Sequence, residues 1–352
     1  MREFLASLVL MAAGTFALPP ASATAQDDAE YERACPWEQR EEPACVEARA
    51  AQSATAYGLA PISDIEGEEY RIYLIDAWDQ ERHVIVFARP AGQTPELTVR
   101  FAVDPQFTLT QPISGEVWNR VERESALITC SVGPPPPRND DRIVVCADGI
   151  LAVVETRSSD GNIRRAAGHS CDRALGRPGV LAYNYAERLH LLAANTLIRC
   201  ADLSREEFSA PWSLLDQCSL LEGDTVAASH ALNLFARFEL GGNDYALPER
   251  ILARGAILTD HDGAIVEGRA AITAYWKTNF ESVRPYRASG LNPETVQIRA
   301  NIDLAESDGR EGPDMWIDEA IIIFGRENYR PLVVTRIELG EPIELTEPDE
   351  DN

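Results

Sequence analysis

Apolar and polar positions in the first half of the chain follow the pattern of β-strands. Residues 70–75 and 83–88 are rich in β-branched and aromatic side chains, and a polar stretch, residues 79–82, separates them. This arrangement predicts a β-hairpin. Similar runs predict further strands at residues 97–103, 126–130, 142–146 and 150–156.

Two segments of the same half have helical periodicity. Ser114 is placed to cap a helix that runs to Arg123, and residues 186–197 carry leucines on one stripe. Strands predominate, so we expect residues 66–203 to form a β-rich α+β domain. The preceding residues 26–65 are acidic and rich in alanine, and they predict a short helical or irregular lead-in.

The pattern changes at Ser204. Ser204 and Glu207 match the S-x-x-E signature of a capping box, and helical spacing then runs through Phe208 and residues 214–221 and again over residues 226–240. The C-terminal domain, residues 204–340, is expected to contain a short helix at 247–254, strands at 256–260 and 264–267, a helix at 268–280 and strands at 295–304, 315–324 and 331–339. Residues 341–352 form an acidic tail that we expect to be disordered.

One stretch of this half resembles a known family. Residues 257–272 read Ile-Leu-Thr-Asp-His-Asp-Gly-Ala-Ile-Val-Glu-Gly-Arg-Ala-Ala-Ile, and Tyr275 and Trp276 follow. A strand that ends in Asp, a turn, and Gly-Arg-x-x-Ile at the start of a helix resemble the nuclear transport factor 2-like proteins, which include the SnoaL-like cyclases and ketosteroid isomerase. The resemblance covers residues 222–340. It implies an α+β cone, in which a curved sheet wraps a helix and leaves a mostly apolar cavity.

The resemblance also implies site residues. Ketosteroid isomerase uses an Asp base with an oxyanion hole of a Tyr and a protonated Asp. Asp260 corresponds to the base and Asp318 to the oxyanion-hole Asp. The Tyr has no counterpart, because its position falls near Phe235 or Ala236, and this departure argues against steroid isomerisation. The side chains expected to line the cavity for a ligand are Tyr275, Trp276, Trp316, His261 and Phe235.

The N-terminus predicts export. Arg2, an apolar run over residues 4–13, Pro19-Pro20 and an A-x-A site at residues 23–25 match a cleavable signal peptide over residues 1–25. The run is too short to span a membrane. We therefore expect a periplasmic or secreted bacterial protein that does not insert into the membrane after cleavage.

The chain has seven cysteines, and an exported chain is expected to pair most of them. The expected disulfides join Cys35 to Cys45, Cys130 to Cys146, and Cys171 to either Cys200 or Cys218. One thiol is then left over.

Composition excludes several classes of function. The net charge of −25 argues against nucleic-acid binding and against docking to anionic lipid. The spacing of His83, His169 and His190 matches no metal site, and His83 and His190 are expected to be packed or surface histidines. The pair Arg164-Arg165 is expected on a loop, and we expect neither a cofactor nor a metal.

Three functions remain. The preferred one is an exported protein whose cone binds a small apolar ligand or a protein partner without catalysis. The second is a lyase, isomerase or cyclase with Asp260 as general base, which requires a carboxyl that points inward with a pKa raised by burial. The third is a structural module that forms a homodimer through its C-terminal sheet, with a cavity filled by aromatic side chains such as Trp276 and Trp316.

Overall fold

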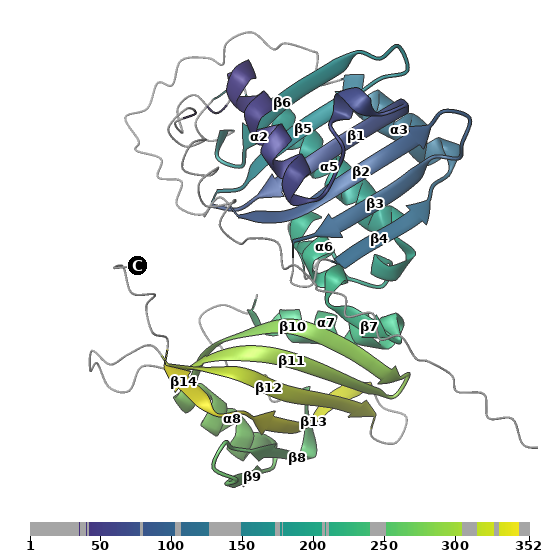
Figure 1. Ribbon diagram of the computed structural model, residues 1–352. Helices are drawn as coiled ribbons and strands as arrows, with labels where there is room; N and C mark the ends of the chain where they lie inside the picture. Colours follow the sequence, from purple (N-terminus) through teal and green to yellow (C-terminus); the bar gives the residue numbers. More distant parts are fainter. Residues whose placement is uncertain are drawn as a thin grey trace, which may run out of the picture.

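The computed structural model describes residues 35, 40, 42–77, 80–102, 107–126, 149–172, 177, 179–205, 208, 211–239, 251–304, 315–326 and 331–344. The expected signal peptide, Cys130, Cys146 and residues 345–352 lie outside these residues. Two sheets with their own helices make up the described chain (Figure 1). The α+β fold class is therefore confirmed.

The N-terminal sheet is antiparallel and has the strand order β4-β3-β2-β1-β5-β6. Its strands are β1 (Gly67–Ile75), β2 (Glu81–Pro90), β3 (Glu96–Phe101), β4 (Phe107–Pro112), β5 (Leu151–Arg157) and β6 (Ile163–His169). The predicted hairpin is β1–β2, and the strands expected at 97–103 and 150–156 correspond to β3 and β5.

Helices cover both faces of this sheet (Figure 1). Helix α2 (Pro43–Ala56), followed by the short η2 (Ile62–Asp64), covers one face, and α3 (Gly115–Ala126) and α5 (Val180–Thr196) cover the other. Ile72 packs in the core with α3 and α5, whereas its neighbour Tyr73 packs in the core with α2. Because both faces are buried, the central strands are nearly continuous runs of apolar residues.

Strand β6 was not expected, because its sequence Ile-Arg-Arg-Ala-Ala-Gly-His has no apolar alternation. The prediction that Arg164-Arg165 lie on a loop was wrong, since both are in β6. Arg165 is tolerated there because it bonds Glu155 of β5 at 2.8 Å and Glu47 of α2 at 3.0 Å. Buried or half-buried charges persist when they are paired in this way.

A connector links the two sheets. It comprises η4 (Ile198–Cys200) and α6 (Pro211–Ser219), joined by a Cys200–Cys218 disulfide, and α6 packs against α5. Cys35–Cys45 is also formed, as expected. Cys171 is disulfide-bonded, but the expected pairing with Cys200 or Cys218 was wrong, because those two bond each other.

The helical segments expected at 214–221 and 226–240 correspond to two helices, with a short strand between them. After α6 the chain forms β7 (Leu221–Gly223) and then α7 (Thr225–Glu239). Asp224 causes the restart, since its Oδ1 accepts a hydrogen bond from the Ala227 N–H at 3.1 Å and so caps α7. Gly223 has a φ of 63°, which turns the chain into that cap.

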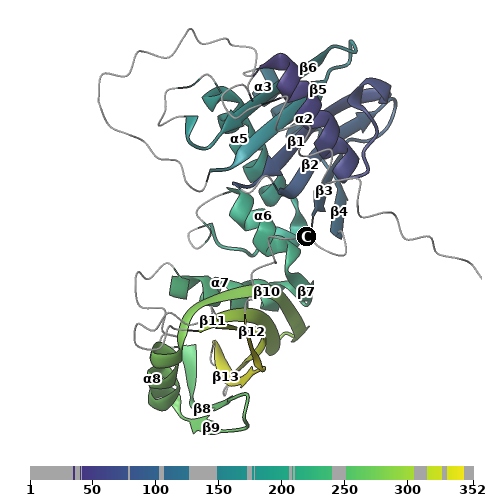
Figure 2. The same ribbon diagram turned by 60° about the vertical axis from the view of Figure 1, so that its left-hand side comes forward.

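The C-terminal sheet has the order β7-β10-β11-β12-β13-β8-β9, and β14 pairs with β12. Its other elements are β8 (Leu252–Thr259), β9 (Ile265–Glu267), α8 (Arg269–Asn279), β10 (Phe280–Asn292), β11 (Thr295–Leu304), β12 (Met315–Arg326), β13 (Leu332–Leu339) and β14 (Pro342–Glu344). The long strands β10–β13 curve around α7 and α8 (Figure 2). This is the cone that the resemblance implies.

Three expectations for this half were wrong. Residues 252–254 begin β8 and are not helical. Residues 342–344 form β14 and belong to the sheet, not to an irregular tail. The longest strand, β10, was missed because Pro285 and Gly290 are typical strand breakers; three register shifts along its pairing with β11 accommodate them.

Candidate functional site

The residue expected to be a general base, Asp260, follows β8 at the start of a tight turn. The Tyr275 hydroxyl of α8 donates a hydrogen bond to its Oδ2. The backbone N–H and Nδ1 of His261 both lie 2.7 Å from its Oδ1. The structure thus brings three expected site residues together, and we call Asp260, His261 and Tyr275 the Asp260 cluster.

Hydrogen bonding decides the charge of this cluster. Burial would raise the pKa of Asp260, but the hydrogen bonds from Tyr275 and His261 outweigh it and hold that pKa below its ordinary value. Burial, followed by the bond to Asp260, raises the pKa of Tyr275. The direction for Asp260 is opposite to the rise that the enzyme hypothesis requires, and an ionised carboxylate of low pKa is a weak base at neutral pH.

Two other expected residues, Trp276 and Phe235, lie in the interior of the cone. Trp276 is 1% exposed and packs edge-on against Phe280, with 4.7 Å between ring centres. Phe235 of α7 is buried in the same core. The interior-facing residues Ile298 and Ile322 of β11 and β12 have no exposed surface. The described residues of the cone therefore pack against one another as a core.

The remaining expected residues are on β12, away from the Asp260 cluster. Asp318 is exposed. The Asn301 Nδ2 on the neighbouring strand donates a hydrogen bond to the Asp318 backbone oxygen at 2.5 Å. The register places Ala320 opposite Ala300 but Ile317 opposite Ile302. Asp318 and its neighbour therefore form a bulge, which turns the Asp318 side chain outward. Trp316 is partly buried, and its indole N–H has no hydrogen-bond partner within the described chain.

A cavity of about 430 Å³ lies beside the first turns of α7. Its walls include Asp202, Asp224, His230 and Arg326. Val226, Ala227, Pro293 and Leu332 also line it, so its walls are of mixed polarity, which differs from the mostly apolar cavity that the resemblance implies.

A partly buried polar cluster that sequence reasoning did not find joins the connector to the N-terminal sheet. His83 of β2 has its Nδ1 3.1 Å from Oδ1 of Asp216 on α6, and Arg82 bonds the other carboxylate oxygen at 3.2 Å. The ring of His190 on α5 contacts the His83 ring edge-on at 5.0 Å. We call His83, His190 and Asp216 the His83 cluster.

Both imidazoles of the His83 cluster are fully buried, which confirms that they are packed histidines. His190 Nδ1 lies 2.7 Å from the Ala186 carbonyl oxygen, to which it must donate. Burial, with a smaller effect of His83, lowers the pKa of His190 to about 3. Each ring keeps a buried Nε2 without a partner among the described residues. No signal in the sequence links these positions, because the contact joins segments far apart in the chain.

Other functional signals are weak in the part of the chain that the structure describes. No group of three or more His, Cys, Asp or Glu side chains there could hold a metal ion. None of the described helices has both the length and the apolar character needed to cross a membrane.

Comparisons with known proteins concern the fold. The enzyme SalBIII, described as epoxide hydrolase/cyclase-like and acting in pyran ring formation in salinomycin, is 14% identical over 32% of this chain and 88% of its own, with a TM-score of 0.26. A cystatin-like domain of unknown function from Nostoc punctiforme is 9% identical over 35% and 78%, with a TM-score of 0.25. A nuclear transport factor 2-like protein with a cystatin-like fold from Novosphingobium aromaticivorans is 16% identical over 32% and 79%, with a TM-score of 0.24. No protein-family profile matches the chain, and no curated protein matches it.

Proposed function

We propose that the chain is exported and that its C-terminal cone is a non-catalytic module that binds a second copy of the chain through its sheet. The single observation that carries this proposal is a sheet face that no described helix covers. The other face of the same sheet packs on α7 and α8 (Figure 2).

The interior of the cone supports a structural role over a catalytic one. Trp276 and Phe280 pack together where a substrate cavity is expected. The carboxylate of Asp260 accepts hydrogen bonds on both oxygens, and its pKa is lowered. A base for proton abstraction needs a pKa close to the working pH, and the pKa of this carboxylate is shifted in the opposite direction.

The uncovered face is formed by the outward side chains of β10–β13, which we call the outer sheet face. It includes Tyr286, Arg287, Arg299, Glu319, Ile321, Ile323, Arg336 and Glu338. Ile321 and Ile323 lie at its centre and are partly exposed. These two isoleucines of β12, with the exposed Tyr286 of β10 on the same face, provide apolar area of the kind that the centre of an interface buries.

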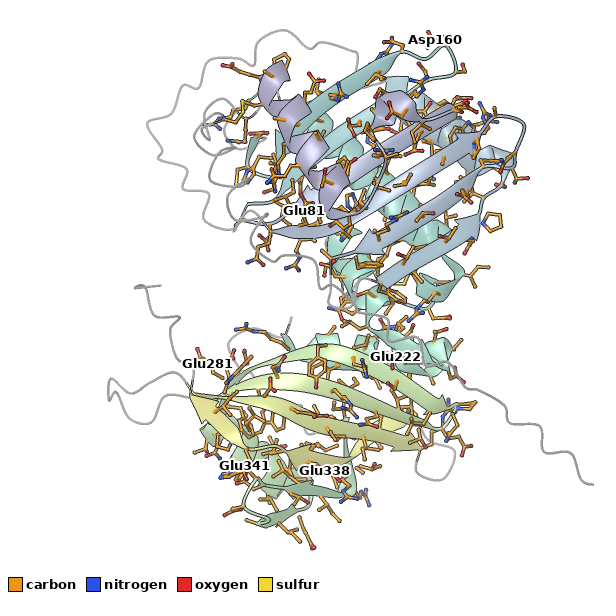
Figure 3. The ribbon with its side chains drawn as sticks, viewed as in Figure 1. Glu81, Asp160, Glu222, Glu281, Glu338 and Glu341 are labelled. Atoms are coloured by element: carbon orange, nitrogen blue, oxygen red, sulfur yellow. A yellow bond between two sulfur atoms is a disulfide. The ribbon has the colours of Figure 1, made fainter. Side chains whose placement is uncertain are left out.

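Charge pairing makes a second copy the favoured occupant. Arg299 bonds Glu319 at 2.6 Å and Arg336 bonds Glu338 at 2.7 Å, so these charges cancel locally. Arg287 also forms an ion pair, with 3.4 Å between it and Glu222 on β7. Figure 3 labels Glu222 and Glu338, which lie on different sides of the C-terminal sheet, so the paired charges are spread across it. Two copies that each have a net charge of −25 repel one another. This repulsion is smallest where the facing surfaces have paired charges, and a two-fold interface brings the same face of each copy together.

Sedimentation equilibrium of the mature protein, starting at residue 26, tests the proposal. We expect a dimer that Ile321→Glu and Ile323→Glu convert to a monomer. Ile265→Glu is the matched control, because Ile265 is 63% exposed and lies on β9, away from the outer sheet face. A wild-type monomer at all concentrations, or a dimer that survives both substitutions, would overturn the proposal. Thermal melts followed by circular dichroism show whether each variant is folded.

Disulfide bonding supports the export part of the proposal. Cys35–Cys45 and Cys200–Cys218 are typical of proteins from oxidising compartments. Expression of the full chain in bacteria, fractionation and N-terminal sequencing test it. We expect a periplasmic or secreted product that begins at Gln26, and retention of the uncleaved chain in the cytoplasm would contradict it.

A further inference from the structure

Strand β6 is an edge strand whose outer side can be assigned residue by residue. Ser170 N–H donates to Ile150 O at 2.9 Å and Ser158 N–H donates to Asn162 O at 3.1 Å, and both pairs fit the β5–β6 register. In an antiparallel ladder, bonded and non-bonded pairs alternate. Even-numbered residues of β6 therefore bond β5, and the N–H and C=O groups of odd-numbered residues point away from the sheet.

Most of this outer side has no partner. The N–H of His169 is capped by the Asp172 carboxylate at 2.5 Å. Within the described chain, the outward N–H and C=O groups of Ile163, Arg165 and Ala167 make no hydrogen bond. A row of unpaired main-chain groups at a sheet edge is a template for another strand.

A groove of about 380 Å³ runs along this edge. Pro43 and Val46 of α2 form one wall, and Leu181 and Ala182 at the start of α5 form the other. Since α2 and α5 cover opposite faces of the sheet (Figure 1), the groove lies between the two helical layers. This is the position that a seventh strand would occupy, one strand spacing beyond β6.

We propose that this groove binds an extended peptide segment of a partner protein, which pairs with β6 as an additional strand and presents apolar side chains to α2 and an acidic side chain to the start of α5. Strand addition of this kind obtains affinity from main-chain hydrogen bonds and specificity from alternate side chains.

The two walls of the groove set the side-chain preference. Side chains that face α2 meet Val46 and Ala167, which belong to one apolar cluster. The opposite face of β6 is the α5 side, because a Cβ on Gly168 would lie 1.9 Å from the Gly179 carbonyl oxygen of the α5 cap. Arg164 shares that face by alternation, and the first-turn N–H groups of α5 add partial positive charge there. A carboxylate is the complementary group.

A second copy of the chain fits this edge poorly. Two β6 edges that pair antiparallel about Ala166 place Arg164 opposite Gly168 and Arg165 opposite Ala167. A second copy would therefore bring two more arginines and no carboxylate to this edge. The charge of the edge therefore favours a foreign, acidic strand.

Amide hydrogen exchange measured by nuclear magnetic resonance on the full mature chain tests the proposal. The probe is the acetylated and amidated peptide Val-Thr-Val-Asp-Val-Thr-Val, with Asn and Lys versions in place of Asp. In the free protein, we expect fast exchange at Ile163, Arg165 and Ala167 and slow exchange at Arg164 and Ala166. The Asp peptide should protect the fast set alone, and it should bind about tenfold more tightly than the Lys peptide.

Two variants sharpen this test. Ala167→Pro removes an outward N–H that β5 does not use, so we expect the fold to persist and peptide protection to be lost. Arg164→Glu should reverse the preference between the Asp and Lys peptides, whereas Arg254→Glu, on an exposed position of β8, should leave it unchanged. Protection of all three outward amides in the free protein overturns the proposal. The proposal is also overturned if none of the peptides binds at millimolar concentration. It is equally overturned if a bound peptide protects amides other than those of the odd-numbered residues of β6.

Discussion

His83 Nδ1 lies 3.1 Å from the Asp216 carboxylate, and this contact fastens the connector to the N-terminal sheet. Burial would raise the pKa of Asp216, but its bonds to His83 and Arg82 outweigh burial and lower that pKa. The Asp216 carboxylate is therefore ionised and accepts the hydrogen bond that the Nδ1–H of His83 donates. His83 is fully buried, and Asp216 is the hydrogen-bond partner of its ring among the described residues.

Removing the acceptor should destabilise the protein. Asp216→Ala leaves the buried His83 N–H without a partner, and such a group costs about 1–3 kcal/mol. Urea unfolding at pH 7 measures the change in the free energy of unfolding. Asp318→Ala, which truncates an exposed carboxylate, is the matched control and should change it by less than about 0.5 kcal/mol. Equal effects of the two substitutions would show that the contact contributes nothing.

Mild acid should weaken the fold through two buried histidines. Burial lowers the pKa of His190 to about 3, and burial together with Arg40 lowers the pKa of His169 to about 4. Because both are below the ordinary value near 6.5, the unfolded chain binds more protons as the pH falls from about 6.5 to these values. Each histidine then removes about 2–3 kcal/mol of stability between pH 7 and pH 4.5.

Urea unfolding from pH 7 to pH 4.5 measures this dependence, and His190→Gln should make it less steep. The control Thr108→Ala alters an exposed side chain that does not titrate and should leave the slope as it is in the wild type. An unchanged slope in His190→Gln would refute the assignment. Carboxylates with lowered pKa values, such as Asp216 and Asp260, act at lower pH, because their contribution is lost only as the pH falls below their unfolded value near 3.9.

The Asp260 cluster predicts a specific shift in a carboxyl titration. Tyr275→Phe removes the hydroxyl that donates to Asp260, and this donor is one of the causes that lower the Asp260 pKa. We therefore expect that pKa to rise in the variant. Carbon nuclear magnetic resonance of the Asp260 carboxyl follows the titration directly. Tyr286→Phe, which is on the outer sheet face, is the control, and a wild-type Asp260 pKa above the ordinary value would support the general-base hypothesis instead.

Salt should strengthen the proposed dimer. Each copy carries a net charge of −25, whereas the outer sheet face contains paired charges of both signs. Added salt screens the long-range repulsion between copies more than it weakens close pairs, since the Debye length falls from about 30 Å at 0.01 M to about 8 Å at 0.15 M. Sedimentation equilibrium at low and high salt measures the dissociation constant. A dimer that dissociates as salt is added would indicate an interface held by unlike charges.

The sequence predicted the elements that bury one face and expose the other, because their apolar and polar residues alternate with the period of a strand or a helix. Strand β11 matches its predicted bounds at Thr295–Leu304, because buried and partly exposed residues alternate along it. Strand β10 was missed, since the register shifts that accommodate Pro285 come from its pairing with β11 and leave no local signal. Strand β7 between α6 and α7 was missed in the same way, because its three residues are defined by their pairing with β10.

The candidate site was predictable only within short stretches of sequence. Asp260, His261 and Tyr275 come together because they belong to one strand–turn–helix unit. The outward position of Asp318 depends on a bulge opposite Asn301, which a strand pattern does not reveal. The His83 cluster depends on contacts between β2, α5 and α6, and no spacing rule links those segments.

The Cys200–Cys218 disulfide has a consequence for the order in which the proposed exported chain folds. Cytosolic thiols are kept reduced, so α6 lacks its covalent link to η4 before export. The link forms only in an oxidising compartment, and it then holds α6 where Asp216 meets His83. Under the export proposal, the covalent link between η4 and α6 therefore forms after translocation, and the reduced chain crosses the membrane without this constraint on the connector.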